Sequence, residues 1–391
     1  MAVIVSAART PVGKFGGALK SLSAVELGAL AVKETVRRSG LDNEAFDLAI
    51  LGQVLQAGCG QIPSRQVTLK AGLPESLPSE TLNKVCASSF RAVTLADTLI
   101  RAGEARAVIA GGMESMSNAP FAVPGMRWGQ RMFNAEMIDL MVHDGLWCAA
   151  YDCHMAVHGG TLAREFGVSR AAQDEWALRS QTRAAEAMRA GRLKEEIVPV
   201  TIAGKKGDLV VDTDEAPRPE TTLEGLAKLP PLFAKDNTVT AGNAPGTNDG
   251  AGALVVMDEK EAAARGLKPL AGIVGSAMVS EDPCRIASVP GRAINKLLQK
   301  TGLSAGDIDL FEINEAFAAV ALVSSGIVGC DPERVNVNGG AVAFGHPIGA
   351  SGARIIMTLI FEMRRRRARY GVAAICSGAA QGDAILLRCD Y

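Results

Sequence analysis

The chain contains 391 residues, 48% of them hydrophobic, and carries a formal net charge of −1. This length exceeds one ordinary domain and supplies enough apolar side chains for a large core. The balanced charge argues against nucleic-acid binding, and no apolar run is long enough to cross a membrane. Eight cysteines without a CxxC spacing indicate free thiols in a reducing compartment. We therefore expect a soluble protein of the cytoplasm, with neither nucleic acid nor a membrane as its partner.

The first part of the chain alternates apolar runs with amphipathic stretches. Strands are predicted at residues 2–7, 46–55 and 107–110, and helices at 23–38 and 86–102. Ser23 can cap the first helix, and Gly40 and Gly103 end the two helices. This alternation is typical of a parallel α/β arrangement.

The alternation stops between residues 119 and 248, where short helices and polar loops replace it. Within this segment a helix is predicted at 169–189, capped by Ser169, and a hairpin-like piece at 205–214. The strand and helix pattern resumes at residue 251. We interpret 119–248 as an insertion into an α/β unit.

The second half of the chain repeats the first. Residues 40–48 match residues 302–310 at an offset of 262 residues, with Gly-Leu and then Asp-Leu at the same places. Residues 86–88 fall on 349–351 at almost the same offset. A duplication would place these two loop–helix junctions opposite each other. The predicted division is an N-terminal half (1–118 and 249–268), an inserted loop domain (119–248) and a C-terminal half (269–391).

Reactive side chains stand at both of these junctions. Cys86 opens a predicted helix, where the helix dipole lowers the pKa of a thiol. His346 lies in the glycine-rich stretch 336–354 before Pro347, which disfavours helical geometry at His346 and so predicts a tight loop. An imidazole held on such a loop can act as a general acid or base. Each residue also has a structural reading, as a buried cysteine or a hydrogen-bonded histidine.

Two further polar groups stand at the ends of predicted strands. Cys376 ends the strand at 373–376, and the glycines behind it free backbone N–H groups for an oxyanion. Asn314 follows the strand at 309–313, where it can hold a water or a carbonyl group, or cap the next helix. The cysteines and histidines between 148 and 158 do not have a zinc-finger spacing, so no metal site is expected.

Five short motifs occur in order along the chain and together resemble the thiolase family. They are Asn83-Lys-Val-Cys86, Gly111-Gly-Met-Glu-Ser-Met-Ser117, Asn314-Glu-Ala-Phe317, the His346 loop and Cys376-Ser-Gly378. The resemblance spans the whole chain. It implies an α/β protein with the thiolase fold, in which two similar halves are stacked in five layers, α-β-α-β-α, with an inserted loop domain.

The resemblance also implies a role for each reactive residue. Cys86 is the nucleophile that takes an acyl group from an acyl-CoA, and His346 activates it. Cys376 is a second acid/base at the α-carbon of the incoming acetyl-CoA. Asn314, through a water, and His346 bind the thioester oxygen, while the N–H groups of Cys86 and Gly378 form a second oxyanion hole. Two thiols and one imidazole cover this chemistry with no cofactor beyond coenzyme A as substrate and product.

The pair His154-Met155 resembles the short-chain members of the family. It implies a narrow acyl pocket and an acetyl-CoA C-acetyltransferase, which reversibly condenses two acetyl-CoA to acetoacetyl-CoA and CoA through an acetyl-Cys86 intermediate. Six residues match coenzyme A contacts of that group: His154, Met155, Arg218, Phe233, Ala241 and Phe317. This chain departs from the family at Gly225 and Pro245, where serine is usual, and at Ala379-Ala380, where two glycines are usual.

Other functions stay open at this stage. A 3-ketoacyl-CoA thiolase of β-oxidation would accept longer acyl chains with the same residues. A ketoacyl synthase would place a histidine where Asn314 stands, and a non-catalytic CoA- or lipid-binding protein would not need all four catalytic positions filled. The resemblance further implies a homodimer or homotetramer, with the loop at 125–139 as a candidate tetramer contact.

Overall fold

The computed structural model describes residues 1–205 and 207–390, and ten of its strands form one sheet. The strand order is β14-β15-β16-β13-β1-β12-β5-β3-β4, with β2 paired to the start of β12. The half of the sheet at the β4 end contains β1 (Ala2–Arg9), β2 (Gly13–Lys14), β3 (Leu48–Gly52), β4 (Ser79–Leu82), β5 (Ala107–Ser115) and β12 (Asn248–Asp258). The other half contains β13 (Ala271–Ser280), β14 (Leu310–Ile313), β15 (Tyr370–Ser377) and β16 (Gln381–Arg388). The halves meet through two residue pairs between β1 and β13.

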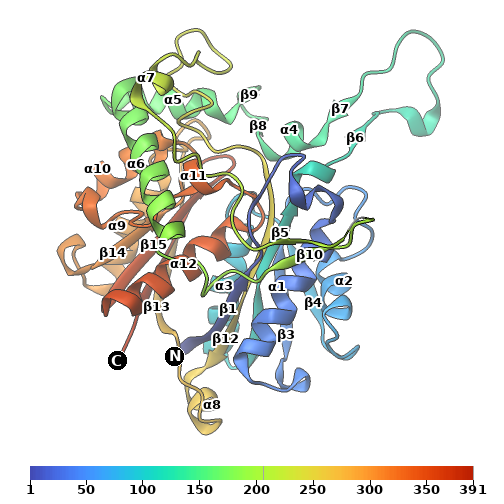
Figure 1. The fold of residues 1–391 in the computed structure, drawn as a ribbon, viewed down its shortest axis with the longest axis vertical. Helices are drawn as coiled ribbons and strands as arrows, with labels where there is room; N and C mark the ends of the chain where they lie inside the picture. The colour runs from blue at the N-terminus through green and yellow to red at the C-terminus, as the bar shows by residue number, and fades with distance from the viewer. Residues whose placement is uncertain (206, 391) are drawn as a thin grey trace.

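Helices cover both faces of each half and complete the five expected layers (Figure 1). The central layer consists of α3 (Ser88–Ala102) and α12 (Ser351–Arg366), which pack on each other and on strands of both halves. Outside the first half lie α1 (Ala24–Ser39) and α2 (Pro63–Lys70). Outside the second half lies α9 (Val289–Thr301), with α10 (Ala318–Val328) packed against it. The two halves also contain two short helices, α8 (Glu259–Ala264) and α11 (Ala341–Phe344).

The layering follows from strands that are apolar on both faces. Along β1, Ala2 and Ile4 join the core around α3 and α12, whereas Val3 and Val5 join the core beneath α1. Successive side chains of a strand point to opposite faces, so each strand contributes to two cores. A continuous apolar run is the sequence pattern of a strand buried on both faces, and this explains why no polar alternation marks these strands.

The predicted repeat is confirmed by the secondary structure of the two halves. Both α1 and α9 end at a glycine in the left-handed region, Gly40 and Gly302. The central helices begin at Ser88 and Ser351. The strand order β3-β5-β12-β1 in one half has its counterpart in β14-β15-β16-β13 in the other.

The expectation of a parallel sheet is wrong for much of this structure. Among the strand pairs of the described residues, only β3–β4, β3–β5 and β14–β15 are parallel, and the pairs that β12 and β16 form are antiparallel. In the second half, β15 returns as β16 through a tight turn. In the first half, the whole segment between β5 and β12 occupies the place of that turn. An antiparallel pair accepts a connection of any length, and this is why a long insertion can stand at this point.

The described residues between β5 and β12 form four α-helices and three two-stranded ribbons. They are β6 (Phe121–Ala122) with β7 (Ile138–Asp139), α4 (Leu140–Gly145), β8 (Trp147–Cys148) with β9 (Cys153–His154), α5 (Met155–Glu165), α6 (Arg170–Arg189), β10 (Val200–Ile202) with β11 (Leu209–Val211), and α7 (Leu223–Ala227). Ser169 caps α6 as predicted. The hairpin predicted at 205–214 is formed by β10 and β11, so its first strand lies before residue 205, earlier in the chain than predicted. Residue 206, which falls within the predicted range, is outside the described residues. No described helix is long and apolar enough to span a membrane.

Candidate active site

The Cys86 loop is held in a strained conformation at the start of α3. Val85 has a φ of 46°, an outlier for a β-branched residue. The side chain of Ser88 fixes the loop, because its Oγ accepts from the N–H of Lys84 at 2.8 Å and donates to the carbonyl of Val85 at 2.7 Å. The helix begins at Ser88, two residues later than the sequence predicted. Cys86 therefore stands on a tight elbow before the helix, with its side chain buried.

The His346 loop is built in the same way at the start of α12. Gly345 has a φ of 96°, and an added Cβ there would lie 2.4 Å from the side chain of Asn248. That asparagine accepts the N–H of His346 at 2.9 Å. The imidazole Nδ1 lies 2.6 Å from Ser351 Oγ, whose hydroxyl donates to the Pro347 carbonyl at 2.9 Å. Because that hydroxyl is engaged as a donor, Ser351 accepts from Nδ1–H, and His346 Nε2 carries the free lone pair.

Asn314 and Cys376 reach the same place from the second half of the sheet. Asn314 follows β14, is fully buried, and places Nδ2 3.5 Å from His346 Nε2. It does not cap α10, because Phe317 occupies the N-cap position there. Cys376 lies near the end of β15, and its thiol interacts electrostatically with that of Cys86. The four predicted catalytic side chains therefore converge, although they come from four different elements.

Burial reverses the acid strength that the sequence predicted for Cys86. Burial raises the pKa of the Cys86 thiol to about 12, and the negative charge of Glu114 adds to the shift. Burial and the positive charge of Arg354 lower the pKa of His346 to about 3. The pKa of Cys376 is also raised, first by burial and then by Cys86. Desolvation outweighs the helix dipole, so the resting site holds neutral thiols and a neutral imidazole.

These shifts predict that resting Cys86 is not a thiolate. We expect the ultraviolet absorbance of a thiolate to be the same in the wild-type protein and in Cys86→Ser at about pH 8, below the raised pKa. A titration of the difference spectrum between the two proteins measures this. A thiolate that belongs to Cys86 and persists below about pH 7 would contradict the predicted effect of burial.

An apolar cavity of about 350 Å³ reaches Cys86 and His346, whereas Cys376 and Asn314 are fully buried and are not among its lining residues. Cys86, His346 and Gly378 stand among its lining residues. Four of the predicted coenzyme A contacts also line it, namely His154, Met155, Phe233 and Phe317. The ring of His154 stacks on Phe233 with centroids 3.8 Å apart, and burial lowers the pKa of His154 to about 4. A neutral imidazole stacked on Phe233 fits the apolar wall of this cavity better than a charged imidazolium would.

A second cavity of about 590 Å³ adjoins the first and opens toward Arg218 and Ala241. The two cavities share the lining residues Leu232, Ala244, Pro245, Gly246 and Thr247. All six predicted coenzyme A contacts thus border one continuous depression. Gly225 and Pro245, two of the departures from the family, also line it.

The cysteines and histidines at 148–158 make local contacts instead of a cluster. His154 Nδ1 accepts the N–H of Ala156 at 3.1 Å, and Cys153 Sγ lies 3.5 Å from His158 Nε2. Among residues 1–205 and 207–390, no three His, Cys, Asp or Glu side chains are grouped to hold a metal ion.

The turn after Cys376 carries backbone strain at the two alanines that replace glycines. Ala379 and Ala380 have φ values of 57° and 49°, in the left-handed region that favours glycine. Ala379 is exposed, so its methyl group contributes little packing.

Replacing Ala379 with glycine is therefore expected to stabilise the protein by about 0.5–1 kcal/mol. Thermal or denaturant unfolding measures the change. Ala171→Gly is the matched control, because Ala171 is exposed within α6 and its replacement should cost about 1 kcal/mol. A destabilised Ala379→Gly protein would show that the left-handed turn is not strained.

Three residues that orient the site were missed by reasoning from the sequence. Ser351 fixes the tautomer of His346, and Asn248 holds its backbone. Glu114 is fully buried and accepts the N–H groups of Val54, Leu55 and Gly349. Burial raises the pKa of Glu114 to about 7. The sequence signal for Glu114 was its position in the Gly111–Ser117 motif, because a carboxylate within a buried strand must be hydrogen-bonded or paired.

Comparison with known proteins gives matches over nearly the whole chain. Residues 2–260 match the thiolase N-terminal domain and residues 267–389 match the thiolase C-terminal domain. The chain is 49% identical over 384 residues to an acetyl-CoA acetyltransferase of Thiocystis violacea, covering 98% of each chain. It is 50% identical over 386 residues to one of Paracoccus denitrificans, covering 99% of this chain and 98% of that protein. A probable acetyl-CoA acetyltransferase of Escherichia coli (strain K12) is 49% identical over 388 residues, covering 99% of each. This chain belongs to the thiolase family.

Proposed function

We propose that this protein is an acetyl-CoA C-acetyltransferase that forms acetoacetyl-CoA and CoA from two acetyl-CoA, and runs the reverse cleavage with the same residues. The observation that carries the proposal is the convergence of two thiols, one imidazole and one amide at the inner end of an apolar cavity, which Cys86 and His346 line and behind which Cys376 and Asn314 are buried. The enzyme is an acyltransferase, and it needs no cofactor beyond coenzyme A as substrate and product.

The first half-reaction transfers an acetyl group to Cys86. Cys86 Sγ attacks the thioester carbon while its proton passes to His346 Nε2, the nitrogen with the free lone pair. The N–H groups of Cys86 and Gly378 stabilise the oxyanion. The carbon–sulfur bond to CoA then breaks, and Cys376 donates its proton to the leaving thiolate. The site is left with acetyl-Cys86, an imidazolium and the thiolate of Cys376.

The second half-reaction forms the carbon–carbon bond. The Cys376 thiolate removes a proton from the α-carbon of the second acetyl-CoA, and its raised pKa makes it a strong base. Charge develops on the thioester oxygen, where His346 Nε2–H and a water on Asn314 stabilise it. The carbanion attacks acetyl-Cys86, the bond to sulfur breaks, and Cys86 recovers its proton from His346. Atoms and charges balance over the cycle.

Mass spectrometry of the protein after exposure to acetyl-CoA tests this function. One acetyl group should appear on the peptide containing Cys86, and it should disappear on addition of CoA. Cys86→Ser should lose both the label and turnover. A wild-type protein that takes no acetyl group on Cys86 would overturn the proposal and favour a non-catalytic CoA-binding protein.

The lining of the smaller cavity supports short acyl chains. Met155 and Phe317 are both buried, line this cavity and belong to the same apolar cluster as Cys376, and we infer from this that they limit the length of the acyl chain. We expect kcat/KM for a ten-carbon ketoacyl-CoA to be about 100-fold below that for acetoacetyl-CoA, because a full pocket cannot accept extra methylenes. Met155→Ala should narrow the difference. Strong cleavage of the long chain by the wild-type protein would identify the broader β-oxidation thiolase instead.

Arg218 is proposed to bind a phosphate or the adenine face of coenzyme A. Arg218 is exposed at the larger cavity, and its guanidinium forms no ion pair with any of the described residues. The inserted segment 119–248 supplies this residue together with His154, Met155, Phe233 and Ala241. We therefore propose that it is the coenzyme A domain between the two halves, 1–118 with 249–268 and 269–391.

The loop between β6 and β7 is proposed to join dimers into a homotetramer. It projects away from the rest of the chain at the upper right of Figure 1. Its exposed apolar side chains are Met126, Trp128, Met132, Phe133 and Met137, and Phe121 of β6 is also exposed. Trp128 and Phe133 are 86% and 89% exposed, and such a patch favours association with another copy.

Light scattering of Trp128→Ser with Phe133→Ser tests this assembly. We expect the variant to be a dimer with full activity and the wild type to be a tetramer. Leu209→Ser is the control, since Leu209 is an exposed apolar residue of β11 outside this loop. A wild-type dimer would overturn the proposal.

A cytoplasmic location is proposed from the eight cysteines, which are all free in the described residues.

A further inference from the structure

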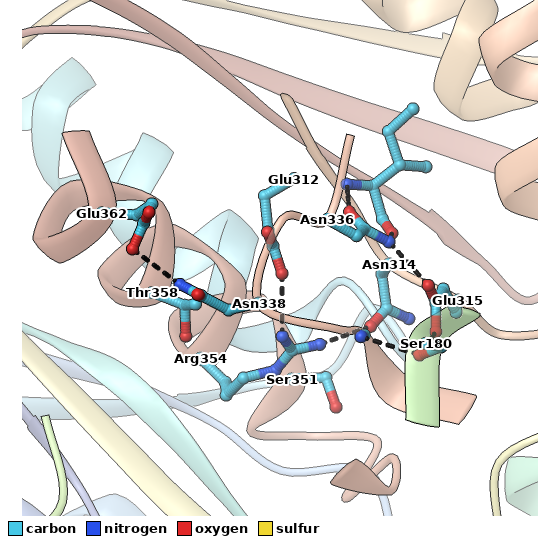
Figure 2. Close-up of polar contacts among 12 residues, drawn as sticks. Ser180, Glu312, Asn314, Glu315, Asn336, Asn338, Ser351, Arg354, Thr358 and Glu362 are labelled. Carbon is cyan, nitrogen blue, oxygen red and sulfur yellow. Dashed lines mark hydrogen bonds and ion pairs between the residues drawn. The ribbon is translucent and has the colours of Figure 1, made fainter. Parts of the chain in front are cut away.

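Arg354 is a buried charge in the first turns of α12, the helix that follows His346. It is 4% exposed, within a helix whose other inward side chains are mainly apolar. Its Nη1 donates to Glu312 Oε1 at 3.0 Å, and its Nη2 lies 3.4 Å from Asn314 Oδ1. Figure 2 shows the guanidinium lying between these two side chains, which both come from the end of β14.

The guanidinium determines which end of the Asn314 amide faces His346. Arginine has only donors, so the Asn314 atom that meets it must be the carbonyl oxygen. The amide nitrogen is thereby directed to the other side, where it lies 3.5 Å from His346 Nε2. Nε2 is the unprotonated nitrogen, because Nδ1–H is engaged with Ser351. Arg354 thus places the Asn314 amide N–H group beside the nitrogen that takes the proton of Cys86, so that both can face the same oxygen of the substrate.

We propose that Arg354 is a positioning residue for the condensation step. Its guanidinium holds the Asn314 amide with the N–H group toward the place where enolate charge develops, and its fixed positive charge strengthens that N–H as a donor. The inference rests on the proposed acetyltransferase function. It assigns to Arg354 a role that acts through Asn314, without contact with the substrate.

The ion pair with Glu312 does not by itself account for a buried arginine. Glu312 is 3% exposed, and burial raises its pKa to about 8 although Arg354 lies beside it. Taking two charges out of water is costly, and replacing a buried pair with apolar side chains is often stabilising. Stability alone would therefore favour an apolar pair at these positions. The bond to Asn314 supplies a reason to keep the guanidinium.

Three variants separate the bond to Asn314 from the bond to Glu312. Arg354→Gln removes the charge and the geometry, and Glu312 can then stay protonated. Arg354→Lys keeps the charge, but an ammonium group lacks the planar arrangement of donors with which the guanidinium holds both Glu312 and Asn314. Glu312→Gln removes the ion pair and leaves the bond to Asn314 in place. Thr358→Val is the stability control, because Thr358 lies one turn further along α12 and donates to Glu196 at 2.9 Å, away from His346.

Each protein is measured for overall kcat and KM, for acetyl labelling of Cys86, and for exchange of the α-protons of acetyl-CoA with deuterated solvent. We expect Arg354→Gln to lower kcat and the proton exchange about 100-fold, as loss of an oxyanion donor does, while KM changes less than about 3-fold. Labelling of Cys86 should still occur. Arg354→Lys should recover part of the loss, and Glu312→Gln should remain within about 5-fold of wild type.

Two outcomes would overturn the positioning role. One is a folded Arg354→Gln protein with wild-type kcat and proton exchange. The other is a loss of kcat in Glu312→Gln or Thr358→Val that matches the loss in Arg354→Gln at equal loss of stability, because a structural effect alone would then be sufficient. Failure of the wild-type protein to acetylate Cys86 would instead remove the proposed function, so the two failures are distinguishable.

Discussion

Replacing Cys376 with alanine is expected to stop the second half-reaction and to leave the first largely intact. Cys376 is the group placed to remove the α-proton, and it is fully buried beside Cys86. Loss of a general base costs about 10²–10⁴-fold in rate, so overall kcat should fall by about 10³-fold or more. The thiolate of CoA is a good leaving group, so transfer of the acetyl group to Cys86 should slow much less.

Mass spectrometry and steady-state kinetics on the same Cys376→Ala sample separate the two steps. Acetyl-Cys86 should accumulate, because the intermediate forms but is not consumed by condensation. Cys330→Ala is the matched control, since Cys330 is another buried cysteine in a core away from the cavity. Its kcat should stay within about 2-fold of wild type. If Cys376→Ala condenses acetyl-CoA at the wild-type rate, another group removes the α-proton.

Replacing Arg9 with methionine is expected to destabilise the fold by about 3–5 kcal/mol, because it leaves two buried carboxylates without the positive charge that compensates them. Arg9 ends β1 and is 2% exposed. Its guanidinium donates to Glu196 Oε1 at 2.7 Å and to Asp214 Oδ1 at 2.7 Å. Both carboxylates belong to the inserted segment, so this one side chain ties that segment to the centre of the sheet.

Denaturant unfolding of Arg9→Met measures the loss. The triple variant Arg9→Met with Glu196→Gln and Asp214→Asn should recover part of it, because the uncompensated charges are gone. Arg37→Met is the control: Arg37 pairs with Glu34 at the surface and is 71% exposed, so its loss should change stability far less than the loss of Arg9. An Arg9→Met protein as stable as the control would show that the donors that remain, the Thr358 hydroxyl to Glu196 and the Val12 N–H to Asp214, are sufficient for the two carboxylates.

The sequence predicted the elements whose signals are local. Ser23 and Ser169 cap α1 and α6, as their positions before amphipathic runs indicated. Gly40 and Gly302 end equivalent helices because each adopts the left-handed conformation that a helix end favours. The repeat could also be predicted, because the two copies keep the same residues at their helix ends and turns. These features depend only on neighbours a few residues away.

Strand direction could not be read from the sequence. The strands β12 and β16 are antiparallel to their neighbours, although the sequence pattern suggested a parallel sheet. A strand that is buried on both faces is apolar throughout, and such a run is the same in either direction. Only the pairing of β5 with β12 across the inserted segment, and of β15 with β16 across a tight turn, decided it.

The candidate catalytic residues were determined by the sequence, but their chemical state was decided by the tertiary structure. Cys86, His346, Asn314 and Cys376 stand in motifs that mark them one by one. The pKa of Cys86 is raised and that of His346 is lowered, against the expectation for a thiol at a helix start. The helix dipole acts within one turn, whereas desolvation arises from every element of both halves that closes over the site. The link from Arg354 through Asn314 to His346 likewise exists only because α12 packs against the end of β14.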